Sequence, residues 1–380
     1  MNSMVYLLAI VIVVALVAYF IFLAPSTGSA AKQTTIVTSI PPAPNTTTVS
    51  PSNPGTSDGS SNASYAPYGW VSAVGYPTPV GDAQCVAVNS RIYCMGGVTA
   101  ANSTRLFYTS DTYSAAVTSN GISGIWRESI PLQIIPSSCT TYSTSIFCIT
   151  GRLLPFYNST TDNVTNQTYV ASTTQTGLGP WAATTTYPVN ATTSGCVTSG
   201  FIIYCVGGMA ANKTFISRSY YAPVSSNGIG QWKETAALPV AANPQCFVYS
   251  LTIYCLGSYV NSNGTMQNFN YYASVTGSGI SSWSSTAPAP NPPGNYSCSY
   301  YKPFIYCIGG GNNYTSMSNV YYTGLSIGGV NGWHLSTVLY PLTVTNSTTC
   351  TSFNDTRFCI GGQSENLSYS NSVYYTTSHV

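Results

Sequence analysis

The stretch Cys85–Gly97 reads CVAVNSRIYCMGG, and the rest of the chain is interpreted from it. Its two cysteines enclose eight residues, a short alternating segment lies on each side of the polar pair Asn89-Ser90, and two glycines end the stretch. Alternating segments around a short polar turn are typical of a β-hairpin. The same pattern returns five more times along the chain, so it is the unit of a repeat.

All twelve cysteines of the chain fall into pairs of the form C-x8-C. The predicted disulfide bonds are Cys85-Cys94, Cys139-Cys148, Cys196-Cys205, Cys246-Cys255, Cys298-Cys307 and Cys350-Cys359. A structural zinc site would need closer spacing and further ligands, and the chain has only two histidines, His334 and His379. Six identical pairs in six repeats also argue against redox catalysis. Disulfides of this kind indicate an oxidising compartment.

The spacing of each pair suits a cross-strand disulfide. A two-residue turn at Asn89-Ser90 places Val88 opposite Arg91, and outward counting places Cys85 opposite Cys94 at a non-hydrogen-bonded position. Cα atoms are about 4.5 Å apart there, within the range of a disulfide. Each bridge should contribute about 2–3 kcal/mol. In the fifth repeat Lys302-Pro303 is poorly suited to this turn, so a wider loop is expected there.

The repeats predict an all-β fold. The first cysteines follow one another after 54, 57, 50, 52 and 52 residues, and tryptophans keep a similar step: Trp70, Trp126, Trp181, Trp232, Trp283 and Trp333. Each period contains four strand candidates, named a to d: a and b carry the cysteines, c carries tyrosines and d starts at the tryptophan. Repeats of about 50 residues built from short strands are typical of propeller blades. We therefore expect a six-bladed β-propeller of four-stranded antiparallel blades.

The repeat resembles the kelch type of β-propeller, in which strand b ends on two glycines, strand c carries Tyr and strand d starts at Trp. The glycine pairs are Gly96-Gly97, Gly207-Gly208, Gly309-Gly310 and Gly361-Gly362, with degraded copies at Thr150-Gly151 and Gly257-Ser258. The resemblance covers roughly residues 68–380 and implies the fold, but no single function, because such propellers host enzymes, binders and scaffolds. Since the chain has a lone strand d at Trp70 and none after its last strand c, the N-terminal strand should complete the sixth blade.

The segment before the propeller indicates a membrane anchor and a spacer. Residues 5–24 carry no charge and could span a bilayer as a signal-anchor helix, with residues 1–4 as a short cytoplasmic tail. Residues 25–67 are rich in Ser, Thr and Pro and are expected to form a disordered stalk, leaving 68–380 for the propeller. The cysteines require the propeller to lie outside the cell. If the apolar segment is cleaved, the protein is secreted instead.

The charge composition argues against nucleic acid as a partner. The chain has ten Lys or Arg and eight Asp or Glu in 380 residues and a net charge of +2, so nucleic acid is not an expected partner.

Fourteen N-x-S/T sequons are candidates for N-glycosylation: Asn45, Asn62, Asn102, Asn158, Asn163, Asn166, Asn190, Asn212, Asn263, Asn295, Asn313, Asn346, Asn354 and Asn366. Within the propeller they gather in b–c and d–a connections. That face should therefore point away from the membrane and carry sugars, or the long polar loops collect sequons by composition alone.

No set of residues predicts catalysis, a cofactor or a metal site. Asp82 is expected to reach the central channel, but a glycosidase needs a second convergent carboxylate, and nothing in the sequence places one beside it. Asp111 and Glu365 are interpreted as solvated charges. The b–c and d–a loops carry Tyr, Phe, Asn and Arg, which suits contact with a protein or a glycan. The leading hypothesis is a non-catalytic, cell-surface adhesion or binding propeller; the alternatives are a structural envelope component and an extracellular carbohydrate-active enzyme.

Overall fold

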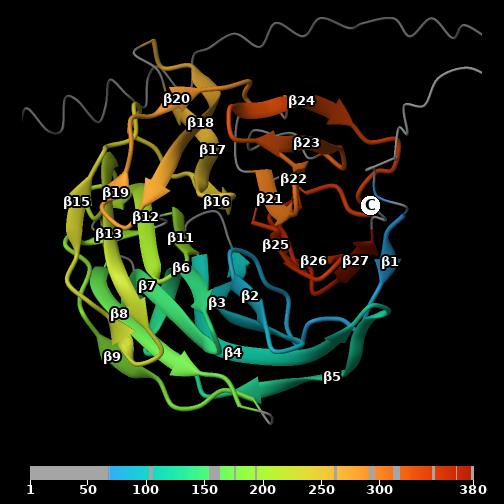
Figure 1. The fold of residues 1–380 in the computed structure, drawn as a ribbon. Helices are drawn as coiled ribbons and strands as arrows, with labels where there is room; N and C mark the ends of the chain where they lie inside the picture. Colours follow the sequence, from blue (N-terminus) through green and yellow to red (C-terminus); the bar gives the residue numbers. More distant parts are fainter. Residues whose placement is uncertain are drawn as a thin grey trace, which may run out of the picture. The chain divides into compact units, whose positions relative to one another are not determined.

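Six antiparallel sheets surround a common centre in the computed structural model of the protein (Figure 1). The structure describes residues 67, 69–101, 106–153, 163–174, 177–192, 195–260, 263–290, 296–310, 317–344, 347–364 and 366–377. Among these residues the regular elements are strands, β1 to β27. The predicted six-bladed propeller of four-stranded blades is confirmed. The predicted tail, anchor helix and stalk, apart from Pro67, lie outside the described residues. Within the described residues no helix is long and apolar enough to cross a membrane.

The first three blades follow the chain in order. Blade 1 contains β2 (Gln84–Val88), β3 (Arg91–Ala101), β4 (Leu106–Thr118) and β5 (Gly121–Ser129). Blade 2 contains β6 (Ile134–Tyr142), β7 (Ser145–Leu153), β8 (Val164–Ser172) and β9 (Ala182–Thr184). Blade 3 contains β10 (Ala191–Thr192), β11 (Gly195–Ser199), β12 (Ile202–Ala210), β13 (Phe215–Ser225), β14 (Gly228–Ile229) and β15 (Lys233–Thr235). In blade 3 the inner strand is divided into β10 and β11, and the outer strand is divided into β14 and β15.

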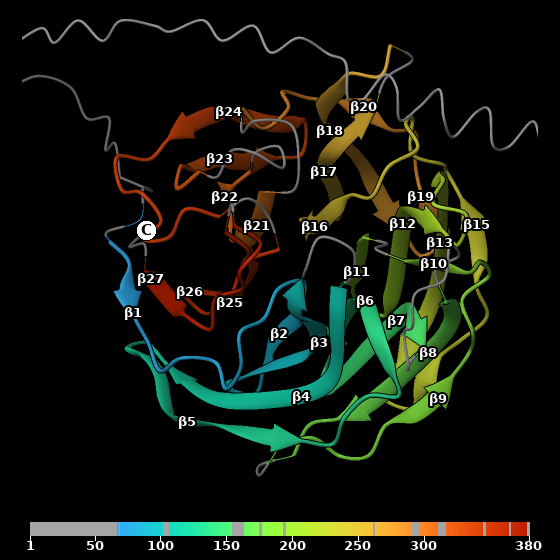
Figure 2. The same cartoon turned by 180° about the vertical axis from the view of Figure 1, so that it is seen from behind.

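The last three blades complete the ring. Blade 4 contains β16 (Gln245–Tyr249), β17 (Thr252–Val260), β18 (Met266–Thr276), β19 (Gly279–Ile280) and β20 (Ser284–Ser285). Blade 5 contains β21 (Tyr296–Tyr301), β22 (Phe304–Gly309), β23 (Val320–Ser326) and β24 (Gly329–Leu335). Blade 6 contains β25 (Thr349–Phe353), β26 (Thr356–Ile360), β27 (Val373–Thr377) and β1 (Val71–Ser72). Figure 2 shows the same ring from behind.

The N-terminal strand closes the ring, as the sequence predicts. β1 pairs with β27 through Val71↔Tyr375 and Ser72↔Tyr374, and the two ends of the propeller lie side by side in both views (Figures 1 and 2). Blade 6 therefore takes three strands from the end of the chain and one from the start of the propeller. This arrangement covers the edge that β27 would otherwise expose.

The inner hairpin of every blade carries its disulfide. Cys85 pairs with Cys94 in the strand register, the same relation holds in the other five blades, and the bonded Cα atoms are 4.0–4.2 Å apart. Asn89 and Ser90 both have positive φ, 52° and 55°, as a primed two-residue turn requires. The wider loop expected at Lys302-Pro303 is wrong: Tyr301 pairs directly with Phe304, and the turn accommodates Pro303 through a cis peptide bond.

The glycine pair at the end of strand b has two structural roles. Gly96, Gly207, Gly309 and Gly361 have φ of 64–68°, and the strand register shifts around Gly96 and Gly207, as in a β-bulge. A Cβ atom on Gly361 would lie 2.0 Å from the carbonyl oxygen of Val80, in the segment that leads into blade 1. The degraded copies differ: Thr150 keeps the bulge with φ of 54°, whereas Gly257 lies in a ladder without a shift.

The core lies between neighbouring blades, and strand b supplies its centre. Two residues before the second cysteine, five blades carry an isoleucine that is fully buried, at Ile92, Ile146, Ile203, Ile253 and Ile305. Blade 6 carries Arg357 at this position, and its side chain is only 1% exposed. The buried residues form clusters, and each cluster joins two neighbouring blades. In one of them Phe147 of blade 2 packs with Ile203 of blade 3.

The repeated tryptophans join each blade to the one before it. The indole N–H of Trp126 donates to the carbonyl of Val74, and Trp283 donates to Ala236, at 3.2 and 3.0 Å. Trp181, Trp232 and Trp333 make the same bond to the connection that follows the preceding blade. Trp70 in blade 6 differs, because its buried indole nitrogen has no acceptor among the described residues. The tryptophan period detected in the sequence therefore reflects contacts between blades.

Candidate functional site

The propeller has two faces, which we name by their connections. The turn face carries the a–b and c–d turns: Arg91, beside the a–b turn of blade 1, pairs with Ala116 close to the c–d turn. The loop face carries the b–c and d–a connections. The predicted ligand surface lies on the loop face, and the parts of its b–c loops at 102–105, 154–162, 261–262, 311–316 and 365 lie outside the described residues. The structure therefore shows the base of this surface.

Asp82 is held on the loop face between blades 6 and 1. It precedes β2 with φ of 54°, and its neighbour Gly81 forms a bridge with Val98 near the loop end of β3. The hydroxyl of Ser347 donates to Asp82 Oδ2 at 3.0 Å, and the backbone N–H of Asp82 donates to the carbonyl of Ser347 at 2.8 Å. Asp82 is thus held by two hydrogen bonds to one residue of the neighbouring blade, one through its carboxylate and one through its backbone.

Asp82 has a cation and two phenols around it. Arg152, at the loop end of β7, interacts electrostatically with Asp82, and its guanidinium carbon lies 5.4 Å from the centroid of the Tyr108 ring. Tyr369 from blade 6 interacts electrostatically with Asp82. The Tyr369 ring packs closely against Gly81, since a Cβ on Gly81 would lie 2.5 Å from the ring. We call Asp82, Arg152, Tyr108, Tyr369 and Ser347 the Asp82 cluster.

The electrostatics of the cluster reflect its enclosure. The loss of bulk water raises the pKa of Asp82, while the hydrogen bond from Ser347 and the charge of Arg152 act in the opposite direction. The Asp82 side chain itself is exposed, so it faces solvent within a surrounding wall of protein rather than a dry interior. Burial also raises the pKa of Tyr369, with Asp82 as the second cause. Both groups are therefore held toward their protonated forms.

Asp111 and His334 have neighbours other than Asp82 among the described residues. Asp111 lies near Tyr76 and Tyr113 in blade 1, where burial and then Asp111 raise the pKa of Tyr113. Glu365 and His379 lie outside the described residues. The ring of His334 packs at a tilt against Tyr322, with 5.3 Å between the ring centroids, next to the strand d tryptophan. Among the residues that the structure describes, the charged group that acts on Asp82 is thus an arginine, where a glycosidase would need a second carboxylate.

The described sequon asparagines are exposed with one exception. Asn163, Asn190, Asn212, Asn263, Asn354 and Asn366 are exposed. Asn166 is half-buried in β8, and its side-chain amide donates to the carbonyl of Tyr187 at 3.0 Å. The remaining candidates, Asn45, Asn62, Asn102, Asn158, Asn295, Asn313 and Asn346, lie outside the described residues. Glycosylation itself stays a prediction.

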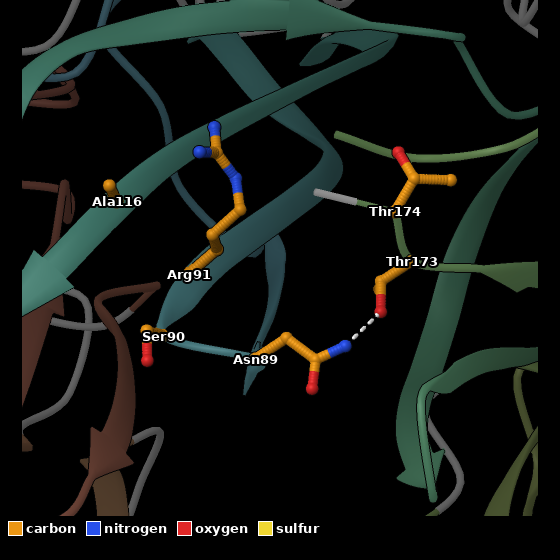
Figure 3. Close-up of a pocket in the computed structure, with 6 residues that line it drawn as sticks. All are labelled: Asn89, Ser90, Arg91, Ala116, Thr173 and Thr174. Carbon is orange, nitrogen blue, oxygen red and sulfur yellow. Dashed lines mark hydrogen bonds between the residues drawn. The ribbon is translucent and has the colours of Figure 1, made fainter. Parts of the chain in front are cut away.

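A concave site lies on the turn face between blades 1 and 2. It is a hollow of about 530 Å³ lined by Asn89, Ser90, Arg91, Ala116, Thr173 and Thr174. Figure 3 shows the guanidinium of Arg91 extending between Ala116 and Thr174, with Asn89 reaching across to Thr173. This site could not be predicted from the sequence, because Asn89 and Thr173 on its two walls are 84 residues apart in the chain and only the packing of neighbouring blades brings them together.

The fold and these sites define a disulfide-bonded, six-bladed β-propeller. No protein-family model matches the chain, and no curated protein matches it. Among solved structures the chain is similar to the one described as "Structure of YjhT", with a TM-score of 0.61 and 12% sequence identity. The likeness covers 79% of this chain and 95% of the other. At this identity it supports the fold alone.

Proposed function

We propose that this protein is a non-catalytic binding propeller displayed outside the cell, and that the Asp82 cluster forms the base of its ligand site. The observation that carries the proposal is the convergence of one carboxylate, one guanidinium and two phenols on the loop face. These groups come from three different blades, since Asp82 and Tyr108 belong to blade 1, Arg152 to blade 2 and Tyr369 to blade 6.

The chemistry of the cluster favours a ligand rich in hydroxyl groups. Asp82 can accept hydrogen bonds and Arg152 can donate them, so together they can bind vicinal hydroxyls of a glycan. The Tyr108 and Tyr369 rings offer apolar faces and polar tips, which suits either a sugar ring or a protein side chain. A glycan is the ligand that uses all four groups.

The location outside the cell is supported by the six disulfides, which persist in oxidising compartments. We propose that residues 5–24 form a single-pass anchor and residues 25–67 a stalk. The chain enters β1 at Val71 opposite Tyr375, close to the end of strand c and hence at the turn face. In this arrangement the turn face points to the membrane and the loop face, with most sequons, points outward.

We also propose that the propeller is of the kelch type. The double-glycine bulges after strand b, the tyrosines of strand c and the inter-blade bonds of the strand d tryptophans support this assignment. The assignment implies no activity, because function in this fold depends on the loops.

The test is a glycan array with the purified full-length protein, followed by calorimetry with the strongest glycan. We expect Arg152→Gln and Tyr369→Ala to weaken binding at least tenfold. The matched control is Arg218→Gln, because Arg218 lies 3.9 Å from Glu234 in an exposed ion pair of blade 3. If no glycan or cell surface binds, the structural envelope alternative is favoured. If bound glycans are cleaved, the carbohydrate-active enzyme replaces the binding propeller.

A further inference from the structure

The hollow at Arg91 lies at the opposite end of blade 1 from the Asp82 cluster. Arg91 is the first residue of β3 beside the a–b turn, whereas Val98, which bridges Gly81, is near the other end of the same strand. A ligand in the hollow would therefore occupy the turn face and would not share the site proposed above. The volume of about 530 Å³ is within the usual range of ligand pockets.

The walls of the hollow are held in place before any ligand binds. The amide of Asn89 donates to Thr173 Oγ1 at 2.7 Å, and this hydroxyl donates to the carbonyl of Thr144 at 2.8 Å. The turn that carries Asn89 and Ser90 is fixed in the left-handed conformation at both residues. A contact between the two blades therefore sets the width of the hollow, and binding would require little ordering.

Arg91 carries a positive charge that no side chain lining the hollow neutralises. Its Nη2 donates to Ser114 Oγ at 3.0 Å, which orients the guanidinium. Its Nε is buried and has no acceptor among the described residues, and the six lining residues include no carboxylate. The guanidinium therefore has no carboxylate to pair with in the hollow, and a ligand carboxylate would supply a charge-assisted partner.

The arginine is specific to this blade. The residues at the same distance from the second cysteine in the other blades are Ser145, Ile202, Thr252, Phe304 and Thr356. None of them is charged, so the repeat itself does not require a cation at this position. The structural role of the position is met by a hydroxyl or an apolar side chain.

We propose that the Arg91 hollow binds a uronate, that is, a sugar ring that carries a carboxylate. The guanidinium can bind a carboxylate with two parallel hydrogen bonds. Asn89, Ser90, Thr173 and Thr174 contribute hydroxyl and amide groups to the lining, and these groups match the hydroxyls of a sugar. A neutral sugar would leave the charge of Arg91 without a carboxylate partner, and a bare inorganic anion would not contact the hydroxyl-bearing wall.

Calorimetry with the full-length protein tests this inference with galacturonate, galactose and inorganic phosphate as probes. We expect galacturonate to bind at least tenfold more tightly than either of the others, and Arg91→Gln to remove that preference. Arg91→Lys should keep only part of it, because an ammonium cannot form the paired contact. Arg127→Gln, which changes an exposed arginine of β5, should leave it unchanged.

A second variant keeps the inference testable if Arg91→Gln is poorly folded. Ala116→Leu retains the cation and fills the hollow, and it should abolish galacturonate binding with little change in thermal unfolding. Equal binding of phosphate and galacturonate, or unchanged binding in Arg91→Gln or Ala116→Leu, would overturn the inference. Loss of glycan binding through Arg152→Gln alone would concern only the loop face, so the two proposals can fail separately.

Discussion

The guanidinium carbon of Arg357 lies 3.6 Å from the centroid of the Tyr306 ring, across the junction between blades 5 and 6. The corresponding residue in each of the other five blades is a buried isoleucine. Burial lowers the pKa of Arg357, and the neighbouring Tyr306 partly offsets this effect. The contact therefore replaces an apolar contact of the repeat with a cation on an aromatic ring.

Replacing this pair by the residues of other blades should stabilise the protein. A desolvated cation–π contact is worth about 2 kcal/mol, whereas an effective penalty of several kcal/mol accompanies each buried ion. We expect the double variant Arg357→Ile, Tyr306→Phe to raise the free energy of unfolding by about 1 kcal/mol, measured by urea denaturation. Arg357→Ala is the control and should be destabilising, because it leaves a cavity. A loss of stability in the double variant would show that the cation is required for ring closure.

Thr150 occupies a backbone conformation that suits glycine. Its φ is 54°, and its buried hydroxyl has no partner among the described residues, whereas Gly96 and Gly207 fill the same position in blades 1 and 3. The left-handed conformation costs a β-branched residue about 1–2 kcal/mol, and glycine loses about 0.5–1 kcal/mol through chain entropy. We expect Thr150→Gly to raise the urea midpoint with an unchanged slope.

The reverse substitution serves as the control for Thr150. A Cβ on Gly207 would lie 2.5 Å from the carbonyl oxygen of Ala242, so Gly207→Thr should be clearly destabilising. If both variants change stability in the same direction, the conformational explanation is wrong.

The tryptophan bonds between blades can be measured one at a time. Trp283→Phe removes the donor to Ala236 and should lower the free energy of unfolding by about 1 kcal/mol beyond the loss of ring size. Trp70→Phe provides the comparison, because the buried indole nitrogen of Trp70 has no acceptor among the described residues. It should be less destabilising than Trp283→Phe in the same urea assay. Equal effects would mean that the indole bonds contribute nothing.

The raised pKa of Asp82 predicts a pH dependence of stability. Because the folded state holds the proton more tightly than the unfolded chain, the contribution of Asp82 is favourable at low pH and is lost as the pH rises through its folded pKa. Asp82→Asn should therefore be more stable than the native protein at pH 7. The difference should vanish below the ordinary pKa of aspartate, about 3.9. Urea unfolding of both proteins between pH 3 and 7 tests this, and a variant that is less stable at pH 7 would contradict it.

Asn166 should be modified less often than its neighbour Asn163. Glycan attachment at Asn166 would disturb the hydrogen bond from its amide to Tyr187 in the half-buried β8, whereas Asn163 is exposed before that strand. Glycopeptide mapping of the full-length protein should find Asn163 and the exposed Asn212 occupied and Asn166 largely free. Full occupancy at Asn166 would show that attachment precedes the folding of blade 2.

Local chemistry explains which features could be predicted from the sequence. The register of the hairpin that joins Cys85 to Cys94 follows from the turn length alone. The lone strand d at Trp70 predicts a pairing with the last strand c, and β27 is that strand. The turn at Lys302-Pro303 was mispredicted, because the flanking strand register outweighs the local preference of proline.

Contacts between blades could not be predicted in the same way. Asp82 was identified from the sequence, but its neighbours Arg152 and Tyr369 come from blades 2 and 6, and their positions depend on the closed ring. The hollow at Arg91 and the stacking of Arg357 have the same origin. Each depends on the angle between two sheets, which no local pattern encodes.

The short closing strand also determines how the propeller responds to mechanical force. A pull on the chain before β1 acts first on the two residue pairs that join Val71 and Ser72 to β27. The inner hairpins cannot lengthen in the same way, because each is closed by a covalent bond between its strands. Under load the ring would therefore peel open at blade 6 while the six hairpins around the centre kept their length. The pairing of β1 with β27, which completes the ring, is thus also its weakest contact under tension.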